Sequence, residues 1–157
     1  MLTAFAASIV IGIFDEVVAQ VVALAVLMPI VASMGGITGS QTLTLTIRGL
    51  ATGQLATSNL RALGNKEVLV AFFNGLLWAL VVSAITTVWF DNIWLSAIIA
   101  LALIINMLIA AIAGIMIPVL LDKMGIDPAL AGSVILTTVT DVVGFFVFLG
   151  SASLLLV

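Results

Sequence analysis

The chain has 157 residues, of which 64% are hydrophobic and 7% are charged, and its formal net charge is −3. Soluble domains carry about 25% charged residues, so this composition predicts a single all-α domain in a lipid bilayer. The four basic residues are too few for the basic surface that nucleic-acid binding requires. Without cysteine or histidine, disulfides, zinc–thiolate sites and Ser-His-Asp catalysis are excluded, and any bound metal must accept oxygen ligands.

The first two apolar segments both depart from an ordinary membrane span. Residues 1–14 are fewer than the roughly 20 that cross a bilayer, so we interpret them as the last part of a truncated helix. Residues 17–47 would measure about 46 Å as one straight helix, against a hydrocarbon core of about 30 Å. Because Pro29 removes a backbone donor and Gly35 and Gly36 weaken a helix, we predict that this second helix is kinked or broken.

The rest of the chain predicts three more spans. Residues 48–66 form a polar connector, and a short loop follows at Asp91 and Asn92. A turn then leads to Asp127 and Pro128, a sequence typical of an N-cap followed by the first helical residue. The sequence therefore predicts a five-helix transmembrane domain, with its first helix truncated and its later spans at residues 68–90, 93–121 and 129–157.

The charges indicate an orientation. The connectors after the first and third spans contain only acidic charges, and those after the second and fourth spans hold every basic residue of the chain: Arg48, Arg61, Lys66 and Lys123. Positive charge marks cytoplasmic loops. We therefore expect a cytoplasmic N-terminus and an external C-terminus.

Asp141 is the strongest candidate for a functional residue. It is the only charged side chain in residues 129–157, and a carboxylate at membrane depth is a functional-site hypothesis by default. Ser133, Thr137 and Asp141 are spaced by four and share one helical face. The second span adds the hydroxyl of Ser40 and an accessible backbone at Gly36. Carboxylate, hydroxyl and carbonyl oxygens together favour a hard cation such as Mg²⁺.

The charge of such an ion predicts a homodimer. One carboxylate per chain only half compensates a divalent cation, and a twofold axis would bring two copies of Asp141 together. Mg²⁺ releases its waters reluctantly, so the two carboxylates would hold a largely hydrated ion.

Other interpretations remain open from these residues alone. Asp141 could titrate in a proton-coupled divalent cation carrier, or it could pack helices in a non-transporting assembly domain. An intramembrane aspartyl protease needs two carboxylates, which only a dimer would supply. Asn74 and Asn106, both in mid-span, are more simply explained by interhelical hydrogen bonds than as ligands.

Several motifs resemble those of a known family. Met28 and Pro29, followed by GGITGSQ at residues 35–41 and RGLA at residues 48–51, are similar to the second-helix signature of the MgtE magnesium channel family. DPAL at residues 127–130 and TTVTDVVG at residues 137–144 resemble its fifth helix. The resemblance implies a homodimeric Mg²⁺ channel of a bacterial plasma membrane, which is not an enzyme, with a pore on the dimer axis lined by the second and fifth helices.

The resemblance also implies roles for individual residues. Asp141 matches the central pore aspartate that holds a hydrated Mg²⁺, and the other matches lie along the pore or, for the last, near its cytoplasmic end: Gly36, Ser40, Ser133, Thr137 and Asp127. Ile37 departs from the asparagine usual in the family. Mg²⁺ is the expected transported ion, with Mn²⁺, Co²⁺ and Ni²⁺ as further candidates. The family also carries cytoplasmic sensor domains before its first helix, and none is present in this sequence.

Overall fold

The computed structural model describes residues 2–55 and 57–156, and every regular element in these residues is a helix. Four of the helices are long and apolar enough to cross a membrane, and a short apolar helix precedes them. The prediction of an all-α, multi-pass membrane protein is therefore confirmed. The helices are α1 (Leu2–Ile13), α2 (Asp15–Gln20), α3 (Val22–Ala51), α4 (Thr57–Phe90), α5 (Ile93–Lys123) and α6 (Pro128–Leu155).

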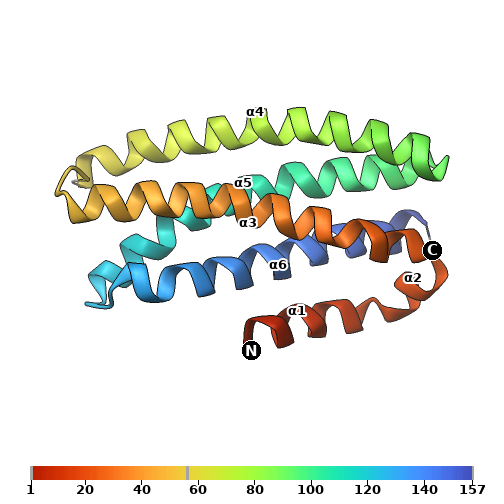
Figure 1. Ribbon diagram of the computed structural model, residues 1–157, viewed down its shortest axis with the longest axis horizontal. Helices are drawn as coiled ribbons and strands as arrows, with labels where there is room; N and C mark the ends of the chain where they lie inside the picture. Colours follow the sequence, from red (N-terminus) through yellow and green to blue (C-terminus); the bar gives the residue numbers. More distant parts are fainter. Residues whose placement is uncertain (1, 56, 157) are drawn as a thin grey trace.

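The helix α5 is the core of the bundle. It packs against α3, α4 and α6, whereas α4 packs mainly on α5 and leaves most of its surface exposed. Figure 1 shows the four long helices side by side, with α1 lying along α6 from the end that carries α2 to about the middle of the bundle. The rings of Phe14 and Phe146 of α6 pack in a T-shaped arrangement, with ring centroids 5.8 Å apart.

The second span is broken at a different place from the one predicted. The chain leaves helical geometry at Val21, with φ −123° and ψ 80°, between α2 and α3. From Val22 the helix α3 then continues through Pro29 and the glycines to Ala51. Membrane helices tolerate proline because neighbouring groups satisfy the freed backbone. The glycines stay helical because two of them pack against other helices, as described below.

Most of the polar connector predicted at residues 48–66 is helical. Arg48 lies in the last turn of α3, while Arg61 and Lys66 belong to α4. The described part of the connection is only residues 52–55, where Gly53 adopts a φ of 66° that favours glycine. The 34 residues of α4 span about 51 Å, longer than a hydrocarbon core of about 30 Å, so polar residues remain helical beyond the lipid tails.

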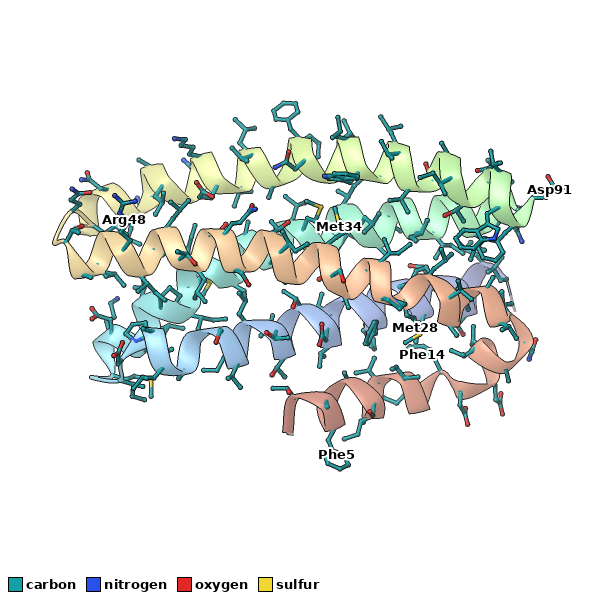
Figure 2. The ribbon with its side chains drawn as sticks, viewed as in Figure 1. Phe5, Phe14, Met28, Met34, Arg48 and Asp91 are labelled. Carbon is teal, nitrogen blue, oxygen red and sulfur yellow. The ribbon has the colours of Figure 1, made fainter. Side chains whose placement is uncertain are left out.

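The predicted starts of α5 and α6 and the separation of charge are found. The Asp127 Oδ1 accepts a hydrogen bond of 2.9 Å from the Ala129 N–H at the start of α6. Asn92 caps α5 in the same way, through the N–H groups of Trp94 and Leu95. Figure 2 shows Arg48 and Asp91 at opposite ends of the bundle. The basic and the acidic connections are therefore at opposite ends.

Candidate functional site on the polar face of α3 and α6

Close contacts set how α3 and α6 align. The helices run antiparallel, and small residues let them approach, because a methyl group added at any of three glycines would meet the other helix at 2.9 to 3.2 Å. The pairs in contact are Val31 with Gly144, Gly39 with Leu136, and Leu43 with Gly132. This alignment places residues 34–38 of α3 at the level of residues 137–141 of α6.

Five of the six predicted site residues therefore lie along one stretch of the bundle. Gly36 lies at a level between Thr137 and Asp141, and Ser40 lies at a level between Ser133 and Thr137. Asp127 is separate, since it lies fourteen residues before Asp141, or about 21 Å along the helix. There it lines an open hollow of about 450 Å³ with Asp122, at the end of the bundle.

Polar residues gather on the exposed side of this stretch, beside exposed apolar side chains at Ile37, Leu45, Val134 and Ile135. An open hollow of about 560 Å³ lies along α3 and is lined by Ser40, Gln41, Thr44 and Leu45. On α6, Ser133 and Thr137 are exposed and Asp141 is partly exposed, as is Gly36 on α3. We call this surface the polar face. It is defined by Ser33, Gly36, Ser40, Gln41, Thr44, Ser133, Thr137 and Asp141.

The hydroxyl groups of the polar face present acceptor oxygens outwards. The Thr137 Oγ1 donates to the Ser133 carbonyl at 2.7 Å, and the Thr44 Oγ1 donates to the Ser40 carbonyl at 2.8 Å. The protons of these two threonine hydroxyls are thus used within their own helices, and the oxygen lone pairs remain available. Within the described residues no three acidic side chains gather as a metal site. One copy of the chain therefore offers one carboxylate at this level, with neutral oxygens around it.

Asn106 of α5 holds the bundle together behind the polar face. Its side chain is fully buried, and its Nδ2 donates to the Val31 carbonyl of α3 at 2.9 Å. It fits between Gly35 and Gly144, where an added methyl group would lie 2.8 Å and 3.1 Å from its Cγ. Among the described atoms, its Oδ1 has no partner. The interhelical hydrogen bond predicted for Asn106 is confirmed, whereas Asn74 is exposed on α4.

Glu67 is a polar residue of the bundle to which the sequence analysis assigned no role. It lies in α4 and accepts a hydrogen bond of 3.3 Å from the Thr42 Oγ1 of α3. Thr42 is buried at 2% exposure, so this contact joins two helices that otherwise barely touch. The only sequence signal was a carboxylate directly before an apolar run. Its partner Thr42 lies 25 residues earlier in the sequence, so residue spacing within one helix could not predict the contact.

The geometry can now be compared with known proteins. The family model described as MgtE, divalent cation transporter, matches residues 28–151. These residues run from α3 to α6 and include the whole polar face. The chain belongs to the MgtE family. This result confirms the family resemblance, and because the family is one of transporters, the interpretation as an intramembrane protease is set aside.

Three relatives named magnesium transporter MgtE match most of this chain. The one from Thermus thermophilus is 35% identical over 156 residues, which are 99% of this chain and 34% of the relative. The one from Bacillus subtilis is 31% identical over 92% of this chain and 32% of the relative. The one from Enterococcus faecalis is 30% identical over 90% and 31%. The chain thus spans about a third of the length of these curated relatives.

Proposed function

We propose that two copies of this chain form a Mg²⁺ channel in a bacterial plasma membrane, with Asp141 as its central ion site. The observation that carries this proposal is the polar face. It leaves a carboxylate and several hydroxyls exposed on helices that are long enough to span a bilayer. Lipid tails do not solvate such groups, so the face needs water or protein against it.

A second copy of the chain would supply a second carboxylate and would cover the polar face. Cyclic dimers are the commonest oligomers, and their interfaces use the same surface on both subunits. Two polar faces around a twofold axis would enclose a hydrophilic passage lined by α3 and α6. They would place two Asp141 carboxylates at one level, which balances the charge of one divalent cation.

The ion would be held mainly through its waters. Mg²⁺ keeps several waters in its octahedral shell and binds through few carboxylates. In this proposal the Asp141 pair accepts hydrogen bonds from those waters. The oxygens of Ser40, Thr137 and Ser133, with the backbone at Gly36, accept others along the passage. Neutral acceptors of this kind discriminate weakly, so Mn²⁺, Co²⁺ and Ni²⁺ are further candidate ions.

The direction of transport follows from the orientation. We place the basic end of the bundle in the cytoplasm by the positive-inside rule, with the N-terminus cytoplasmic and the C-terminus external. A potential of 100 mV then favours entry of a divalent ion by about 4.6 kcal/mol, twice the value for a single charge. Passive flow through a pore would therefore move the ion inwards. Asp127, at the cytoplasmic mouth, would raise the local cation concentration.

The deciding experiment is Mg²⁺ uptake into proteoliposomes by the wild-type chain and Asp141→Asn. We expect uptake to fall about tenfold or more, since losing about 1.4 kcal/mol of ion stabilisation already gives tenfold. Asp91→Asn is the matched control, because Asp91 has a φ of 50° that asparagine also adopts. Unchanged uptake in Asp141→Asn would instead support the assembly domain. Flux that follows the pH gradient at a fixed Mg²⁺ gradient would support the proton-coupled carrier.

The dimer has an independent test. The sequence contains no cysteine, so a single introduced cysteine reports on one position. We expect Ile37→Cys, at a position 56% exposed beside the polar face, to form disulfide-linked dimers in membranes. Val88→Cys, at a position 88% exposed on α4, should remain monomeric. Cross-linking at Val88→Cys alone would place the interface elsewhere and contradict the proposed pore.

A further inference from the structure

A groove between α4 and α5 lies outside the polar face. It is open, has a volume of about 590 Å³ and is lined only by residues of these two helices. Arg61, Gly64 and Asn65 of α4 form one end, and all its other lining residues are apolar, ending at Phe72 and Leu108. The groove thus has one basic, polar end and a long apolar part.

The groove crosses the boundary between lipid headgroups and lipid tails. The α4 sequence has no charge from Val68 to Phe90, a length of about 34 Å that matches a hydrocarbon core of about 30 Å. Phe72 therefore lies among the lipid tails. Arg61 and Asn65 lie on the other side of Val68, at the level of the headgroups. The polarity of the groove follows that of the membrane around it.

The polar end has the donors that a phosphate needs. Arg61 and Asn65 are one helical turn apart and both are exposed, and a guanidinium binds phosphate oxygens through paired N–H donors. The groove contains no acidic side chain. The nearest carboxylate on α4, that of Glu67, accepts a hydrogen bond from Thr42 of α3, so it is used on another side of the helix.

We propose that this groove binds an anionic phospholipid from the leaflet at the basic end of the bundle. Its phosphate would be held by Arg61 and Asn65, and one acyl chain would lie along Val68, Phe72 and Leu108. A soluble anion would leave the apolar part uncovered, and a zwitterionic lipid would gain less from the unbalanced positive charge. The proposal does not depend on ion transport, so its test uses lipid binding alone.

The test is competitive retention of phosphatidylglycerol and phosphatidylcholine, counted by native mass spectrometry of protein released from mixed-lipid nanodiscs. Wild type should retain phosphatidylglycerol about fivefold more strongly, and Arg61→Gln should abolish that preference. Gly64→Leu should lower retention of both lipids by filling the groove, because an added Cβ at Gly64 meets nothing nearer than the Ile115 Cδ1 at 3.9 Å. Arg48→Gln is the matched control, because Arg48 is an exposed arginine outside the groove.

Three results would overturn the proposal. Equal retention of the two lipids by wild type would show that the groove does not prefer anionic lipid. Equal losses in Arg61→Gln and Arg48→Gln would show a general attraction of anionic lipid to the basic end rather than a site. Disulfide-linked dimers of Gly64→Cys in membranes would make a second copy of the chain the occupant. Arg61→Gln decides the matter by itself if Gly64→Leu does not fold, since it changes only an exposed side chain.

Discussion

The two faces of α3 use the same residue types for opposite purposes. Gly35 and Gly36 are neighbours, yet a methyl group at Gly35 would lie 2.8 Å from the Asn106 Cγ, whereas one at Gly36 would meet nothing within 4 Å. Gly39 on the first face packs against Leu136, and Ser40 on the second is exposed. On the face that carries Gly35 and Gly39, the small residues are required by contacts with the neighbouring helices. The other face has no packing reason for its composition within one chain, which is why we assign it to the proposed pore.

The largest expected difference between the two faces is in Gly35→Val against Gly36→Val. Gly35→Val would overlap Asn106 and should lower the free energy of unfolding by about 1–3 kcal/mol or more. Gly36→Val should change it by only about 0.5 kcal/mol, but should reduce Mg²⁺ uptake about tenfold by narrowing the proposed pore. Unfolding in detergent and proteoliposome uptake measure the two effects. If the two variants lose the same free energy of unfolding, Gly35 and Gly36 are equally packed and the two faces of α3 do not differ in packing.

A double-mutant cycle would measure how strongly Gly35 and Asn106 are coupled on the face of α3 that packs against α5. Asn106→Ala removes the hydrogen bond to Val31 and the group that Gly35 accommodates, so we expect a loss of about 1–3 kcal/mol in unfolding free energy. Gly35→Ala should be less harmful in that background than in wild type, by about 0.5–3 kcal/mol. Gly36→Ala is the control and should combine additively with Asn106→Ala. Additivity at Gly35 would mean that the contact is not tight.

Asp127, at the end of the bundle and separate from the polar face, tests whether an acidic residue acts through structure. Its carboxylate caps α6, so Asp127→Ala should lower stability by about 1 kcal/mol, and Asp127→Asn should retain most of it because asparagine also caps well. Thermal unfolding of the two variants in the same detergent measures this. Equal losses in both would mean that the charge, rather than the cap, stabilises the helix end.

The smallest effect is expected for Ser40→Ala. An exposed hydroxyl on the polar face makes no packing contribution, so stability should change by no more than about 0.5 kcal/mol. Uptake of Mg²⁺ should fall only a few-fold, because a neutral hydrogen bond contributes about 0.5–1.5 kcal/mol. A loss as large as that of Asp141→Asn would make Ser40 a direct ligand of the ion.

Much of the candidate site could be predicted because its signals are local. The spacing of Ser133, Thr137 and Asp141 places them on one side of any helix, and a lone carboxylate in an apolar run stands out without a structure. Spacing within one helix could not say which residues of α3 lie opposite Asp141. That alignment depends on the pairs Gly39–Leu136 and Leu43–Gly132, which are far apart in the sequence.

The sequence by itself determined the membrane class, the cap at Asp127 and the separation of charge between the two ends, because each depends on composition or on a few neighbouring residues. Only the tertiary structure decided where the second span breaks. Pro29 and Gly35 weaken a helix in isolation, but packing in the bundle keeps α3 continuous past both. The tertiary structure also decided the partner of Asn106, because Val31 is 75 residues away and only the folded bundle brings their helices together.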